Sequence, residues 1–188
     1  KNYISKNDWQ IIIDDIKKNI PCNIGEGGDI RISNYQHYSK TASKFLNNTF
    51  FLEVGKKMLG HNADSNTKRC QLGILTYKNG SECSGGGWHV DRHTTQFKAL
   101  LYVTNVTIDN GPFNIFSPPL KSTDYTALDL PGRSNTRFSD DIENVFKNRC
   151  KIITGDAGDV ILVDTSNIHR GSKINDNIRI TLTNYYYD

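Results

Sequence analysis

The chain has 188 residues, of which 36% are hydrophobic and 23% are charged, and its formal net charge is +3 at pH 7. This size and composition predict one globular domain with a single core. The small charge and the lack of a basic run argue against a nucleic-acid partner, and no apolar stretch reaches the ~18 residues of a membrane span. The four scattered cysteines form no C-x-x-C pair, so we expect free thiols and a cytoplasmic protein.

The first third of the chain is predicted to be helical. Asn7 and Gln10 form a candidate capping box, and "SKTASKFLNNTFFLEVGKKMLG" reads as further helix that ends at Gly60. The stretch "NDWQIIIDDIKKNI" places five apolar residues on one helical face: Trp9, Ile12, Ile13, Ile16 and Ile20.

From about Thr67 the apolar pattern changes to a period of two, which predicts strands. The segments are "KRCQLGILTY", "FKALLYVTNV", "KIITGDAGDVILVDTS" and "NIRITLTNYYY". Asp140 and Glu143 resemble a capping box for a short helix that ends near Asn148. We therefore expect a mainly β (α+β) single domain over residues 1–188. Its helical flank (1–66) precedes antiparallel strands (67–188) in sandwich or barrel form.

The segment "GGGWHVDRHTTQF" carries the candidate metal ligands. Alternate residues of a strand share a face, so His89 and Asp91 on a strand would point the same way. His169, after the strand-like "GDVILVDTSN", is the leading candidate for a third ligand. Two imidazoles and one carboxylate suit non-haem Fe(II), with open positions for a co-substrate and oxygen. His93 competes with His169 for the third position, although a place at the pocket rim suits it better.

Arg179 lies ten residues after His169, across a turn centred near Ile174. In an antiparallel hairpin the two residues would lie roughly opposite one another and point to the same face. The Arg179 guanidinium would then bind a carboxylate near the metal through two parallel hydrogen bonds. Thr181 shares that face and adds a hydroxyl.

The quartet His89, Asp91, His169 and Arg179 resembles the signature of Fe(II)/2-oxoglutarate-dependent oxygenases. Trp88, "DNGPF" (Asp109 to Phe113) and "HRG" (169–171) resemble the phytanoyl-CoA dioxygenase-like branch, over roughly residues 52–187. The segment "FNIFSPPLKST" departs from the pattern of that branch.

The resemblance implies a double-stranded β-helix (a jelly roll, cupin-like) and an enzyme. His89, Asp91 and His169 would bind Fe(II), Arg179 and Thr181 would hold the far carboxylate of 2-oxoglutarate, and O2 would take the remaining position. The implied reaction is hydroxylation of an unactivated C–H bond in a small molecule or carrier-linked group, releasing succinate and CO2, with ascorbate as a supporting reductant. The presence of Asp91 disfavours halogenation.

Several assignments stay open at this point. A protein side-chain hydroxylase and a non-catalytic jelly-roll binding module are the alternative functions. Three polar strand residues either contact 2-oxoglutarate or are ordinary strand residues: Tyr77, Lys98 and Tyr102. Arg133 and Arg137 either meet an anionic substrate or belong to a solvated loop. His37 and His61 are expected to be surface histidines, and Gly85 to Gly87 to border the pocket.

Overall fold

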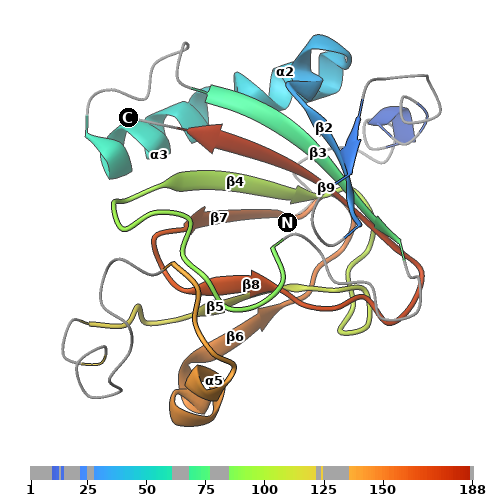
Figure 1. Ribbon diagram of the computed structural model, residues 1–188. Coiled ribbons are helices and arrows are strands. Elements are labelled where there is room, and N and C mark those ends of the chain that lie inside the picture. The colour runs from blue at the N-terminus through green and yellow to red at the C-terminus, as the bar shows by residue number, and fades with distance from the viewer. Residues whose placement is uncertain are drawn as a thin grey trace.

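The part of the chain that the structure describes forms two antiparallel sheets, one above the other in Figure 1. This computed structural model describes residues 10–12, 14, 22–24, 28–60, 68–76, 85–121, 124 and 136–186. The larger sheet has the order β1 (Asn23–Ile24), β2 (Ile30–Ser33), β3 (Lys68–Thr76), β9 (Ile178–Tyr186), β4 (Phe97–Tyr102) and β7 (Val160–Asp164). The smaller sheet has the order β6 (Cys150–Ile153), β5 (Phe113–Phe116) and β8 (His169–Gly171).

The chain moves repeatedly between the two sheets, and this confirms the predicted jelly roll. After β3 and β4 in the larger sheet it forms β5 and β6 in the smaller one, and β7, β8 and β9 then alternate between the sheets. The predicted strand over 151–166 is two strands in different sheets, separated by a turn in which Gly158 has a φ of 97°.

Two helices, α2 (Lys40–Leu46) and α3 (Thr49–Leu59), cover the outer face of the larger sheet (Figure 1). On β4 the residues Phe97, Ala99 and Leu101 are fully buried in the cluster that these helices complete. Each buried Phe or Leu stabilises the fold by about 1.5–3 kcal/mol. The alternate residues of the same strand therefore face the other sheet.

The two helices replace the single one predicted over residues 39–60. Asn48 is the reason for the break, because its side chain accepts a hydrogen bond from the Phe51 backbone N–H at 3.3 Å and so begins a new helix. Ser39 caps α2 in the same way, and Gly60 follows α3 with a φ of 82°, as the sequence predicts. None of the described helices is both long enough and apolar enough to span a bilayer.

Strands β1 and β2 lie within the first third of the chain, where only helices were predicted. β2 pairs with β3 and extends the larger sheet, with Arg31 opposite Gly73. Of the helix predicted around residues 7–20, Gln10 to Ile12 and Asp14 are helical, and Ile12 is buried. The remainder of that prediction, including Asn7, lies outside the described residues.

A second, smaller core lies at the side of the small sheet that carries α5 (Asp141–Val145) and η3 (Lys147–Arg149). The predicted capping box at the start of α5 is wrong, because the Asp140 side chain makes no cap and Ser139 Oγ accepts the Asp141 N–H instead. The Asp140 and Glu143 carboxylates bind Arg170, at 3.3 Å and 2.8 Å. The Arg170 guanidinium in turn lies 4.4 Å from the Trp88 ring centre, so this network fixes the segment next to His89.

The short helix η1 (Tyr35–His37) joins β2 to α2 and places His37 on the surface, as expected.

Candidate metal centre and co-substrate pocket

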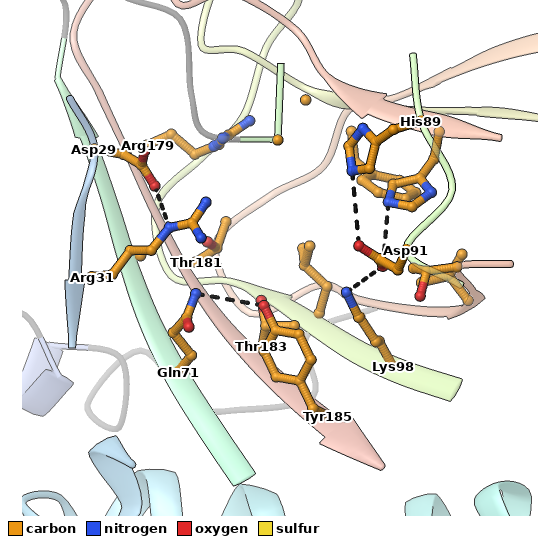
Figure 2. A pocket seen from close by; sticks show the side chains of 18 of the residues that line it. Asp29, Arg31, Gln71, His89, Asp91, Lys98, Arg179, Thr181, Thr183 and Tyr185 are labelled. Atoms are coloured by element: carbon orange, nitrogen blue, oxygen red, sulfur yellow. Dashed lines mark hydrogen bonds and ion pairs between the residues drawn. The ribbon is translucent and has the colours of Figure 1, made fainter. Parts of the chain in front are cut away.

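His89, Asp91 and His169 come together at one end of the space between the sheets. Their candidate ligand atoms all lie within 4.8 Å of one another. His89 Nε2 is 3.9 Å from Asp91 Oδ1, and His169 Nε2 is 3.6 Å from Asp91 Oδ2 (Figure 2). The two imidazoles and the carboxylate thus surround one point at which a cation would be attracted.

Both imidazoles are oriented through the nitrogen that faces away from this point. His89 Nδ1 lies 2.9 Å from the Gly87 carbonyl, and His169 Nδ1 lies 2.8 Å from the Asn167 carbonyl. Because a carbonyl oxygen only accepts hydrogen bonds, each Nδ1 carries the proton and each Nε2 presents a lone pair. This is the arrangement of histidines that bind metals.

Backbone hydrogen bonds hold His89 and His169 side by side. The N–H of each donates to the carbonyl of the other at 2.9 Å, and Asp91 N–H donates to the Thr165 carbonyl at 3.0 Å. His89 is an isolated bridge and Asp91 lies in a bend, so the expectation of a regular strand through both is wrong. The segment is held instead from two sides, by residues 136–138 and 165–169.

The glycines before Trp88 are part of this framework. The Gly85 carbonyl accepts the Gly171 N–H at 2.8 Å, and the Gly86 carbonyl accepts Arg137 Nη1 at 3.1 Å. Gly87 has a φ of 73°, which an ordinary side chain would disfavour, and this conformation offers its carbonyl to His89. Gly85 also lines the cavity, so this segment borders the site.

The three side chains have the protonation states that a cation site requires. Burial lowers the pKa of His169 to about 4, with a further contribution from His89, and burial also lowers the pKa of His89. Burial alone would raise the pKa of Asp91, but the Lys98 charge and then His169 outweigh it and hold that pKa below its usual value. At neutral pH the group therefore contains two neutral imidazoles and one carboxylate.

Lys98, one of the residues whose role the sequence left undecided, contacts the triad directly. It lies on the cavity face of β4, is 8% exposed, and places its Nζ 2.5 Å from Asp91 Oδ2. The alternation of β4, in which Phe97 and Ala99 are buried on the opposite face, was the signal that put Lys98 inside. The alternation does not predict the pairing of Lys98 with Asp91, because this contact depends on how the two segments pack in the fold.

The hairpin predicted between His169 and Arg179 is wrong. His169 begins β8, which pairs with β5 in the smaller sheet, whereas Arg179 is on β9 between β3 and β4 in the larger sheet. The intervening residues cross from one sheet to the other, because a jelly roll wraps successive strands around a common interior. The two residues therefore face one cavity from opposite walls rather than lying side by side.

That cavity has a volume of about 440 Å³ and is lined by the triad, Lys98, Arg179 and Thr181, among others. On β9 the residues Arg179, Thr181, Thr183 and Tyr185 alternate along the wall shown in Figure 2. Thr181 is paired with Gly73 on one side and Tyr102 on the other.

The DNGPF segment holds Arg179 in place. Arg179 Nη1 donates a hydrogen bond to the Gly111 carbonyl. Asn110 Nδ2 donates to the Asp176 carbonyl at 2.9 Å, and Asn175 N–H donates to the Asp109 carbonyl at 2.7 Å. The segment therefore fixes both the chain that crosses between the sheets and the guanidinium at its end.

Two of the remaining candidates, Tyr102 and Arg137, also line the cavity. Tyr102 lines the cavity, but its hydroxyl is occupied, because it donates to the Ile153 carbonyl and accepts the Phe113 N–H. Arg137 lines the cavity beside His89. His93 is exposed and lies outside the cavity lining. Three candidates lie outside the described residues: His61, Tyr77 and Arg133.

Comparison with known proteins identifies the fold. No protein-family profile matches the sequence, and no curated protein matches it. Solved structures do match. The epimerase SnoN in complex with Fe3+, alpha ketoglutarate and nogalamycin RO has a TM-score of 0.67 and 11% identity, covering 100% of this chain and 77% of that one. HygX from Streptomyces hygroscopicus with nickel and 2-oxoglutarate has a TM-score of 0.63 and 13% identity, covering 98% and 80%.

A Pseudomonas putida prolyl-4-hydroxylase has a TM-score of 0.62 and 12% identity, covering 98% of this chain and 88% of that one. The fold of this chain is thus the jelly roll found in 2-oxoglutarate oxygenases. Identities this low establish the fold, and the chemistry has to be argued from the site.

Proposed function

We propose that this chain is an Fe(II)- and 2-oxoglutarate-dependent oxygenase that hydroxylates an unactivated C–H bond of a small molecule or carrier-linked group. The observation that supports it most is the donor set, in which His89, Asp91 and His169 converge with both Nε2 atoms presented inward. Two imidazoles and a carboxylate on one side of a metal are typical of non-haem Fe(II). The donor types, their protonation states and their spacing all fit that ion.

Different residues of the cavity would bind the metal and the co-substrate. His89, Asp91 and His169 would hold the iron, and Arg179 with Thr181 would bind the far carboxylate of 2-oxoglutarate on the opposite wall. When bound, iron with 2-oxoglutarate and O2 supplies the oxidising chemistry, with succinate and CO2 as products and ascorbate as a supporting reductant. Phe113 lies against His169, with ring centres 5.3 Å apart, and helps to exclude water from this part of the cavity.

Further details of the assignment rest on the sequence. Trp88, the DNGPF segment and HRG support a place in the phytanoyl-CoA dioxygenase-like branch. Epimerisation of the substrate carbon is an alternative reaction, because the epimerase SnoN shares the fold. A peptide is an alternative substrate, because a prolyl-4-hydroxylase also shares the fold. The described cysteines are free thiols, which supports a cytoplasmic location: Cys22, Cys70 and Cys150.

The direct test is 2-oxoglutarate turnover. The purified protein is incubated with Fe(II), ascorbate, 2-oxoglutarate and O2, and succinate is measured with and without a library of metabolites and peptides. We expect slow succinate formation without substrate, and an accelerated rate with a mass gain of one oxygen for a small-molecule substrate. Acceleration by peptides alone would favour the protein hydroxylase. Absence of succinate despite tight metal binding would favour the binding module.

A further inference from the structure

The two histidines of the candidate metal centre belong to backbone segments that carry a second opposed pair of residues on their outer side. His89 and His169 are partners in an antiparallel bridge, both line the cavity, and their ring centres lie 4.4 Å apart. In this pairing the next opposed residues are Trp88 and Arg170, and they point to the opposite face. The Arg170 guanidinium accordingly lies over the Trp88 ring, 4.4 Å from its centre. A movement of one segment relative to the other would therefore displace both pairs together.

Arg170 also joins these two segments to helix α5. This helix lies on the outer side of the smaller sheet, away from the larger sheet (Figure 1). Arg170 Nη2 donates to Glu143 Oε2 at 2.8 Å, and Nη1 donates to Asp140 Oδ1 at 3.3 Å. The chain that leads into α5 is itself bonded to the first histidine segment, because the Phe138 N–H donates to the Trp88 carbonyl at 2.9 Å. One guanidinium thus connects three segments that meet behind the histidine pair.

The segment that carries His89 and Asp91 has little regular structure to hold it. His89 is an isolated bridge and Asp91 lies in a bend. The two 2.9 Å hydrogen bonds between His89 and His169 form a hinge about which this segment could tilt. A tilt would change the distance between the two Nε2 atoms. The contact of Arg170 with Trp88 lies beside this hinge and opposes such a movement.

Stability alone does not account for an arginine at this position. Its side chain is 21% exposed and lies against Trp88, a residue of the smaller apolar core. Among the described residues, Arg170 Nε and Trp88 Nε1 are buried donors without a hydrogen-bond partner. Unpaired buried donors cost free energy, and an ion pair removed from water often stabilises a fold less than apolar packing does. A role in orienting the neighbouring segments explains the arginine better.

We propose that Arg170 is a positioning residue of the metal centre, which holds the backbone of His89 and His169 at the separation that a bound cation requires. This inference rests on the proposed oxygenase function, because the metal is what makes this separation matter. Arg170 lies outside the cavity lining, so it acts through Trp88 and through the backbone next to His169. Groups that orient a ligand without touching the metal typically change metal affinity about 10- to 100-fold.

The experiment measures Co(II) binding to the chelator-treated protein by calorimetry and by the visible absorption of the bound ion, which depends on ligand geometry. Arg170→Gln and Glu143→Gln weaken the network from either end. Arg149→Gln is the matched control, because Arg149 also pairs with a carboxylate, Asp124 at 3.0 Å, and lies 5.2 Å from the centre of the Phe146 ring. Its side chain is 23% exposed, and within the described part of the chain its side-chain hydrogen bonds go elsewhere than to the histidine segments. Urea unfolding of each metal-free protein measures stability separately.

We expect Arg170→Gln to raise the dissociation constant of Co(II) about tenfold or more, and to alter the absorption of the bound ion at saturation. Glu143→Gln should change both in the same direction but by less, because Asp140 still pairs with the guanidinium. Arg149→Gln should lower stability and keep the wild-type affinity and spectrum.

Wild-type affinity and absorption in Arg170→Gln would overturn the proposal. An equal loss of affinity in Arg149→Gln would also overturn it, since the effect would then follow from stability. If Arg170→Gln does not fold, Glu143→Gln decides, and a wild-type affinity and spectrum in that variant overturn the proposal. Failure of the wild type to bind Co(II) would count against the oxygenase function and this role together, whereas binding that no variant changes would count against the role alone.

Discussion

Lys98 and Asp91 form an ion pair within the candidate metal centre, with Nζ 2.5 Å from Oδ2, while Oδ1 of the same carboxylate faces His89 Nε2 at 3.9 Å. A lysine on one carboxylate oxygen leaves the other oxygen available to a cation. Asp91 would then occupy one coordination position of the metal, and the positions opposite the triad would stay open for 2-oxoglutarate and O2.

The first prediction concerns this lysine. Lys98→Met should reduce succinate formation at pH 7 by about tenfold and move the acidic limb of the pH profile to higher pH. The reason is that the Lys98 charge is the largest contribution holding the pKa of Asp91 down. The measurement is the rate from pH 5 to pH 8, and Lys98→Arg, which keeps the charge, should retain a profile closer to the wild type. An identical acidic limb in the methionine variant would show that Lys98 does not control Asp91.

The triad itself gives the second prediction. Asp91→Ala and His169→Ala should each abolish Fe(II)-dependent succinate formation and weaken Ni(II) binding by at least about 100-fold, since even the loss of an outer partner costs 10- to 100-fold. His93→Ala is the matched control, because this histidine comes from the same segment but is exposed and outside the cavity lining. Full activity of either triad variant would remove that residue from the site. Loss of metal binding in His93→Ala would reopen its role as a ligand.

The sequence predicted which side chains come together better than it predicted the backbone that carries them. His89, Asp91, His169 and Arg179 all reach one cavity, as expected from residue types and their spacing. The supporting structure differs, because Asp91 lies in a bend and His169 and Arg179 belong to different sheets. Side-chain chemistry is visible in a sequence, whereas pairing between distant strands depends on tertiary packing.

The dependence of strand pairing on tertiary packing also explains why β2 was not predicted and why Arg31 was not expected in the cavity. β2 has only four residues, too few for a clear alternation, and it becomes a strand because β3 offers it an edge. Arg31 therefore reaches the cavity from a region where helices were expected. Asp140 and Glu143 have the spacing of a capping box, but Arg170, 27 residues or more away, competes for both carboxylates.

The third prediction concerns the co-substrate. Arg179→Ala should raise the dissociation constant of 2-oxoglutarate about 10- to 100-fold, because a charge-assisted pair of hydrogen bonds to a carboxylate is lost. Binding is measured by calorimetry on the Ni(II)-loaded protein, with Lys151→Ala as an exposed control. Ni(II) affinity in the absence of 2-oxoglutarate should be unchanged. An unaltered 2-oxoglutarate affinity would assign the far carboxylate to another group.

Gly111→Ala gives a fourth prediction for the same subsite. Gly111 has a φ of 69°, and an added Cβ would lie 2.8 Å from the Ser172 carbonyl and 3.3 Å from Arg179 Nη1. The substitution should therefore displace the crossing chain, lower the thermal stability and weaken 2-oxoglutarate binding together. Gly60→Ala is the control, since Gly60 also has a positive φ but no atom within 4 Å of an added Cβ and lies outside the cavity lining. Gly60→Ala should lower stability and leave 2-oxoglutarate affinity unchanged. An equal loss of affinity in both variants would show that Gly111 has no specific effect on the 2-oxoglutarate subsite.

The fifth prediction is a pH dependence of the metal-free protein. Burial lowers the pKa of His169 from 6.5 to about 4, so between these values the unfolded chain binds a proton that the folded one does not. The free energy of unfolding must then rise with pH in this window, and the stabilisation present above pH 6.5 is lost as pH falls towards 4. The shift corresponds to about 3 kcal/mol over the whole window.

Urea unfolding of the chelator-treated protein at pH 7, 6 and 5 measures this slope, and His169→Gln should reduce it because its amide does not titrate. His89, whose pKa is also lowered from 6.5 by burial, contributes with the same sign in this pH range and leaves part of the slope in that variant. His93→Gln, at the exposed position, should keep the wild-type slope. If the wild type and His169→Gln lose stability equally between pH 7 and pH 5, His169 is not held neutral by burial, and the protonation state assigned to the candidate metal centre is wrong.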